Sequence, residues 1–148
     1  MVKGIIEVKS SFSISQLNDE FIKKIDTIIS LFNEIDHNEF FSGLFVFGRA
    51  NMVIDESNIE NFKNPLKRLC NKINHIAWGK DNLIKFWQDK NVFSVYKLNN
   101  LGYSYFISNL IVTISKYVPD QIWIRFPIRE GKNKFKIGDI NCNEIRSI

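Results

Sequence analysis

The sequence is short of the residues from which most metal, phosphate and catalytic sites are built. Its 148 residues include only two histidines, two cysteines and seven glycines. His37 and His75 have no second histidine or cysteine at the spacing of zinc ligands. Gly43 and Gly48 bracket an expected strand, and no Lys-Ser or Lys-Thr follows them, so GLFVFG does not match a phosphate-binding loop. No serine has a nucleophile elbow around it. We therefore expect no cofactor, no metal site and no catalytic residue set.

Long apolar runs are also missing. Residues 1–12 contain no apolar run of signal-peptide length and no small-residue cleavage site. The most apolar stretch, Phe106–Ile114, is interrupted by polar residues and is too short to span a bilayer. Two cysteines, Cys70 and Cys142, are more typical of a reduced chain than of a disulfide framework, and we expect Cys70 to act as a small buried hydrophobe. These features predict a cytoplasmic protein without membrane contact.

Hydrophobic periodicity predicts one α+β domain over residues 1–148, with a single mixed sheet of about five strands and three to four helices. A three-layer α/β arrangement is the alternative. The expected order is β-α-β-α-α-β-α-β-β. The strands are expected at 2–8, 40–49, 92–98, 121–128 and 134–140, and the helices at 15–35, 64–78, 81–89 and 103–118.

Two of these segments carry most of the prediction. Residues 40–49 are apolar on both faces, which predicts a central strand, and Gly43 and Gly48 predict a bulge or a close neighbour there. Residues 121–128 alternate between apolar and other side chains, and Pro127 predicts an edge strand. The turn at 130–133 predicts that the last strand pairs back antiparallel.

Charge is divided unequally along the chain. Residues 1–62 carry five basic and ten acidic side chains, and residues 63–148 carry fifteen basic and six acidic ones, so the two parts have net charges of −5 and +9. Such an asymmetry bears on partners and not on fold. The acidic side chains of two connectors are candidates for binding a basic partner: Glu34, Asp36, Glu39, Asp55 and Glu56. Phe40 and Phe41 would add apolar anchors if either side chain is exposed.

The basic part allows two other interpretations. A nucleic-acid-binding surface could be formed by Lys67, Arg68, Lys72, Trp123, Arg125 and Arg129, with the tryptophan available for stacking. No ribonucleoprotein motif, helix-turn-helix or GxxG loop accompanies these residues, and a solvated lysine-rich face is the simpler interpretation.

A metal-dependent nuclease is the second alternative. Pro119-Asp120 followed by Glu130-Gly131-Lys132 resembles the PD-(D/E)xK nuclease motif, in which two acids hold a metal ion and a lysine assists the attacking water. In that family the acid and the E-x-K segment lie at converging strand ends. Here Asp120 and Glu130 bracket one expected strand and would be about 30 Å apart if it is extended. A helix stop followed by a hairpin turn explains both segments more simply.

In its size, composition and lack of a catalytic residue set, the whole chain resembles the immunity proteins of bacterial toxin–immunity pairs, including those of contact-dependent growth inhibition systems. The resemblance implies a non-catalytic inhibitor that binds a cognate toxin domain and occludes its active site. Partners of basic nuclease toxins are usually acidic, whereas this chain has a net charge of +4. Within this resemblance, either the acidic N-terminal part forms the interface or the toxin is not a basic nuclease.

Overall fold

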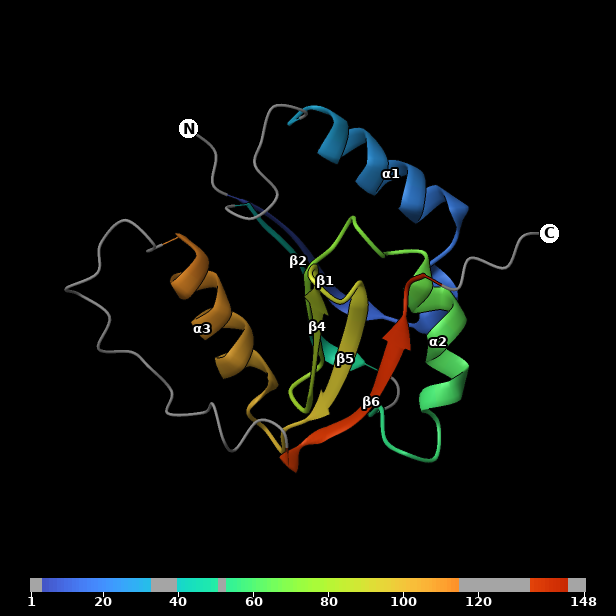
Figure 1. Ribbon diagram of the computed structural model, residues 1–148, viewed down its shortest axis with the longest axis vertical. Coiled ribbons are helices and arrows are strands. Elements are labelled where there is room, and N and C mark those ends of the chain that lie inside the picture. The colour runs from blue at the N-terminus through green and yellow to red at the C-terminus, as the bar shows by residue number, and fades with distance from the viewer. Residues whose placement is uncertain (1–3, 33–39, 51–52, 115–133, 144–148) are drawn as a thin grey trace.

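The fold is a mixed β-sheet with helices on both faces, as the computed structural model in Figure 1 shows for residues 4–32, 40–50, 53–114 and 134–143. Within these residues the sheet has six strands in the order β1-β2-β3-β4-β5-β6. The strands are β1 (Gly4–Phe12), β2 (Phe41–Ala50), β3 (His75–Trp78), β4 (Asn82–Trp87), β5 (Val92–Lys97) and β6 (Lys136–Asn141). β1, β2 and β3 are parallel neighbours, and β3 to β6 are paired antiparallel. The predicted α+β class with one mixed sheet is confirmed.

The helices α1 (Asp19–Ser30) and α2 (Ile59–Lys67) lie on one side of the sheet, and α3 (Gly102–Ile114) lies on the other (Figure 1). A 3-10 turn, Ile14–Gln16, leads from β1 toward α1, and the backbone N–H of Ser13 donates to Oε1 of Gln16 at 2.7 Å. That contact matches the capping-box spacing of these two residues in the sequence.

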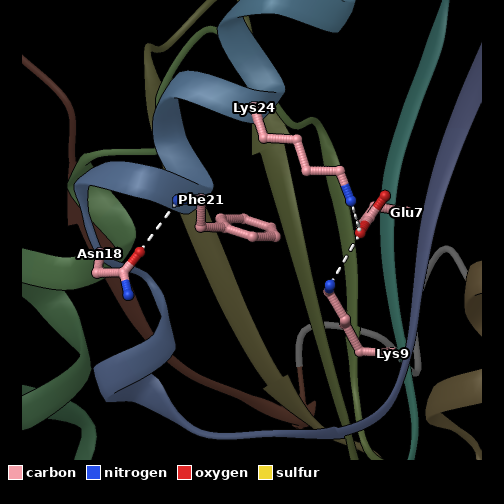
Figure 2. A network of polar contacts seen from close by, with 5 residues as sticks. All are labelled: Glu7, Lys9, Asn18, Phe21 and Lys24. Carbon is pink, nitrogen blue, oxygen red and sulfur yellow. Dashed lines mark hydrogen bonds and ion pairs between the residues drawn. The ribbon is translucent and has the colours of Figure 1, made fainter.

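α1 is capped at its start and is joined to β1 by an ion pair at its middle, as Figure 2 shows. Asn18 caps the helix because its Oδ1 accepts the backbone N–H of Phe21 at 3.0 Å. Nζ of Lys24 lies 2.6 Å from Oε1 of Glu7 on β1, and Nζ of Lys9 lies 3.0 Å from the same oxygen. Burial opposes ionisation of Glu7, but the hydrogen bonds from Lys24 and Lys9 outweigh it, so the pKa of Glu7 is lowered.

The core on the α1–α2 side is the larger of two buried clusters. It joins side chains from all six strands to the inner faces of α1 and α2, and β1 contributes only its last residue, Phe12. Its fully buried members include Leu44, Leu66, Ile76 and Ile84. Arg68 pairs with Asp19 and Lys72 pairs with Asp26, which adds two ion pairs between α1 and the segment after α2. This side of the sheet is therefore closed by both apolar packing and charge pairing.

On the α3 side the buried cluster is smaller and is centred on Phe106. The Phe106 ring makes edge contacts with Phe41 and Phe45 of β2, at centroid distances of 5.3 and 5.1 Å. A Cβ at Gly43 would lie 2.6 Å from Cζ of Phe106, so only glycine leaves room for this ring. The close neighbour predicted for Gly43 is confirmed. The central position of β2 is also confirmed, and its pairing with β1 slips between Lys9 and Ser11.

The helix predicted at 64–78 is confirmed only over residues 64–67, and the helix predicted at 81–89 is wrong. α2 begins at Ile59 and contains Pro65 in its interior, and the chain leaves helical geometry at Asn71, which has a φ of 63°. Residues 75–78 and 82–87 are strands β3 and β4, and most of their side chains are buried from both faces. A short apolar run that is buried on two faces has no period-2 signal, so periodicity cannot separate it from a helix. Gly79 does have the predicted left-handed φ, at 64°, but it follows a strand.

The prediction of two reduced cysteines is also wrong, because Cys70 and Cys142 form a disulfide. The bond joins the turn after α2 to the residue after β6, with a Cα–Cα distance of 6.0 Å and a sequence separation of 72. Disulfides persist in oxidising compartments and are rare in a reducing cytosol. The cytoplasmic location thus loses the support that it took from reduced thiols and stays a prediction.

The other predicted elements are confirmed with shifted ends, except one that lies outside the described residues. The first strand, the long amphipathic helix and the third strand correspond to β1, α1 and β5. The last strand corresponds to β6, which pairs antiparallel with β5. The helix predicted at 103–118 is α3 as far as Ile114. The strand predicted at 121–128 lies outside the described residues.

Candidate functional site

Of the five acidic side chains predicted to bind a partner, two lie in the described residues. Glu34, Asp36 and Glu39 lie outside the described residues. Asp55 is used by its own turn, since its Oδ1 accepts the backbone N–H and the hydroxyl of Ser57 at 2.9 and 2.5 Å. These hydrogen bonds lower the pKa of Asp55. Of the five candidates, Glu56 is the one that the structure places as an exposed side chain.

Three of the six nucleic-acid-binding candidates lie in the described residues, and Arg68 and Lys72 among them form ion pairs within the chain. Arg68 is held by Asp19 and also donates to the backbone oxygen of Leu17 at 3.0 Å, and Lys72 is held by Asp26. Lys67 is half-buried at the end of α2. The other three nucleic-acid candidates, Trp123, Arg125 and Arg129, and the nuclease candidates, Asp120, Glu130 and Lys132, lie outside the described residues.

The charge division seen along the chain does not persist in space. Asp19 and Asp26 from the acidic part are paired with Arg68 and Lys72 from the basic part. Glu60 is paired with Lys63 across the same boundary, at 2.5 Å. Among the described residues, these three pairs compensate part of the −5 and +9 asymmetry.

An apolar surface that the sequence analysis did not identify lies on the α3 side of the sheet edge. It consists of Ile6, Val8 and Phe47, which we call the edge strip. Ile6 pairs with Gly43 and Val8 pairs with Phe45, so the two β1 residues share the face on which Phe106 packs. The exposed fractions are 39% for Ile6, 54% for Val8 and 49% for Phe47. Alternation in β1 was hidden in the sequence because both Ile5 and Ile6 are apolar.

Several side chains of α3 are also apolar and exposed. Ile107, Val112 and Ile114 are each more than 40% exposed on a helix that has no charged residue. Large exposed apolar patches on a protein commonly mark sites of interaction with another molecule. Because β1 is an edge strand of the described sheet, its backbone also has hydrogen-bonding groups on the side away from β2.

A cavity of about 490 Å³ lies at the end of the sheet where β2 and β3 begin and β4 ends. We call it the sheet-end cavity. Polar groups at its floor are interlinked: Oδ1 of Asn74 accepts the backbone N–H of Ser42 at 3.0 Å and lies 2.7 Å from Nδ1 of His75. Nδ2 of Asn74 donates to the backbone oxygen of Phe40 at 3.0 Å, which fixes the amide orientation. Nδ1 of His75 therefore carries a proton.

His75 lies on β3, and its ring stacks on Phe41 at a centroid distance of 4.6 Å. The partner side chain across the antiparallel pair is Lys85 of β4. No local pattern indicates this pairing, because both residues lie in segments that periodicity predicts to be helices.

No group of three or more histidine, cysteine, aspartate or glutamate side chains that could hold a metal ion occurs among the described residues. Within the same part of the chain, every helix is too short or too polar to cross a membrane. Comparison with protein-family models, with curated proteins and with solved structures found no match to this chain.

Proposed function

We propose that this chain is a non-catalytic binding protein of the toxin–immunity kind, which neutralises a cognate protein toxin by covering its active site. The observation that carries the proposal is the edge strip. Three large apolar side chains stand exposed beside an edge strand, next to a helix whose outer side is also apolar. Exposed aromatic and aliphatic anchors next to a backbone edge suit a stoichiometric protein partner.

The charges at the β1 edge of the sheet favour a partner of opposite sign over a second copy of this chain. On the α1 face of β1, opposite the edge strip, Lys9 and Lys24 share the single carboxylate of Glu7, which leaves one positive charge at this edge. A second copy would bring the same charge against it, whereas an acidic rim on the partner would complement it. The proposed toxin surface is therefore apolar with an acidic rim, and a basic nuclease surface fits less well.

The test is protection of cells and formation of a complex with the toxin encoded beside this chain. Cells that express the toxin domain should survive when wild-type protein is co-expressed, and the two proteins should copurify in equal amounts. Val8→Asp and Phe47→Asp should abolish both results, because each puts a charge into the apolar contact. The matched control is Leu31→Asp, which changes an apolar residue that is 75% exposed at the end of α1.

Other outcomes decide between surfaces. If Glu56→Lys abolishes protection while Val8→Asp retains it, the acidic candidates and not the edge strip form the interface. If wild-type protein neither protects cells nor binds the toxin domain, the proposed function is wrong. Circular dichroism of each variant establishes that the fold is retained before binding is compared.

A further inference from the structure

The sheet-end cavity is lined by both apolar and polar side chains, and among them is one charged group that has no carboxylate partner in the described residues. Its walls come from the C-terminal turns of α1 and α3 and from the strand ends, and they include Ile29, Phe32, Phe40, Phe86 and Val112. A volume of about 490 Å³ lies within the range of pockets that hold small organic ligands. Such pockets are mostly apolar and have a few polar groups that orient the ligand.

The charged group is Lys85, which projects from β4 toward α3. Its Nζ donates to Oδ1 of Asn109 at 3.0 Å and lies 4.3 Å from the centre of the Trp87 ring. Among the described residues no carboxylate lies within ion-pair distance of it. Burial lowers the pKa of Lys85, because removal from water disfavours its charged form.

The other lysine at the cavity, Lys72, is already neutralised. Its ammonium pairs with Asp26 of α1. The asparagine that holds Lys85 is itself fixed, since Nδ2 of Asn109 donates to the backbone oxygen of Tyr105 at 2.7 Å. An ammonium group has three N–H donors, and one of those of Lys85 is used by Asn109. The cavity thus presents a single positioned cation with donors to spare.

We propose that the sheet-end cavity binds an amphiphilic monocarboxylate, with the carboxylate on Nζ of Lys85 and the apolar body between α1 and α3. One uncompensated cation matches a single negative charge, and a phosphate dianion would leave a charge unpaired in an apolar pocket. The aromatic and aliphatic walls match an acyl or aryl body. This site is separate from the edge strip and is independent of the toxin-binding proposal.

The test is calorimetric titration of the full chain with decanoate, 1-decanol and decylamine, each below its micellar concentration. Decanoate should bind with one-to-one stoichiometry. The alcohol should bind at least about tenfold more weakly, since a hydrogen bond to a charged group is worth about 1.5–3 kcal/mol. The amine should not bind measurably. Equal binding of the three probes would show nonspecific apolar adsorption and would overturn the proposal.

Variants locate the site. Lys85→Met should weaken decanoate binding at least about tenfold, whereas Lys85→Arg should retain most of it. Lys63→Met is the matched control, because it removes a partly exposed lysine of α2 that pairs with Glu60. Val112→Trp should block binding with Lys85 unchanged, because it fills the cavity from α3. Unchanged affinity in both Lys85→Met and Val112→Trp would contradict the assignment, as would the absence of decanoate binding to the wild type.

Discussion

The two faces of the sheet differ in how much of their apolar surface is buried and in how many cross-links they carry. The α1–α2 face holds the larger buried cluster, two ion pairs between α1 and the turn after α2, and the Cys70–Cys142 disulfide. The α3 face holds a smaller cluster around Phe106, and it exposes the edge strip. The lysine of the sheet-end cavity also projects to the α3 side.

This difference separates stability from binding. On the α1–α2 face, Arg68 and Lys72 are paired with Asp19 and Asp26, and the buried cluster is covered by the two helices. On the α3 face, the ammonium of Lys85 has no carboxylate partner among the described residues, and several large apolar side chains are exposed. Exposed apolar side chains and a partly buried charge without an ion pair lower the stability of the isolated chain, and such features are expected where a protein binds a partner or a ligand. The following predictions test whether the two faces differ in this way, from the largest expected effect to the smallest.

The largest effect is expected on the α1–α2 face. The double variant Cys70→Ser, Cys142→Ser should lower the free energy of unfolding by about 4 kcal/mol, because the disulfide closes a loop with a sequence separation of 72. Denaturant titration of both proteins with and without reductant measures it. Reductant should destabilise the wild type and leave the double variant unchanged. Equal stability of the oxidised wild type and the double variant would show that the crosslink does not hold this face.

A smaller loss is expected from Gly43→Ala on the α3 face. The new Cβ would lie 2.6 Å from Cζ of Phe106 and 2.7 Å from Cε1 of Phe41, inside a packed aromatic group. Overpacking of this kind costs about 1–3 kcal/mol. Gly138→Ala is the matched control, because its Cβ would meet the mobile end of Ile59 on the α2 side. Thermal unfolding should show the larger loss for Gly43→Ala, and the reverse order would contradict the packing described for α3.

Lys85→Met should keep or raise the stability of the isolated protein, by up to about 1 kcal/mol, because it removes a partly buried charge. The pKa of Lys85 is lowered in the fold, so the unfolded chain binds more protons between that pKa and 10.5. Stability of the wild type relative to Lys85→Met should therefore rise with pH across this window. Chemical denaturation at neutral and alkaline pH measures the difference. A clear loss of stability in Lys85→Met at neutral pH would mean that Lys85 is structural.

The smallest effect is expected for Glu7→Gln at the junction of β1 and α1. The pKa of Glu7 is lowered in the fold, so its ion pairs contribute stability above about pH 4.5 and lose it as pH falls through the folded pKa. These pairs are partly exposed, so the loss at neutral pH should be at most about 1 kcal/mol. The variant and the wild type should converge in stability at low pH. A constant difference at all pH values would exclude the charge as its cause.

The sequence was sufficient for elements that show one clear period. The apolar stripe of α1, the two-faced burial of β2 and the glycine beside Phe106 were all predictable, since each leaves a local pattern. β3 and β4 were not, because strands buried on both faces resemble short helix stripes. Pro65 was placed at a helix start by its usual preference, yet it lies inside α2.

The candidate sites depended on contacts that no local pattern contains. The pairs Arg68–Asp19 and Lys72–Asp26 join residues 49 and 46 positions apart, so charge counted along the chain misrepresented charge in space. The disulfide was missed because two cysteines in a chain of 148 residues do not form a recognisable framework. Lys85 became a candidate only when β4 placed it beside His75 and α3.

The most direct test of the difference between the faces uses the toxin domain that the proposed function places in a neighbouring gene, and measures its affinity for three proteins: wild type, Val8→Asp and Leu31→Asp. Val8 lies in the edge strip, and Leu31 is an exposed apolar residue at the end of α1. Titration calorimetry should show that Val8→Asp weakens binding by about 30-fold or more, the loss expected for an interface anchor, while Leu31→Asp binds as the wild type does. Equal losses in the two variants, or a loss in Leu31→Asp alone, would contradict the account.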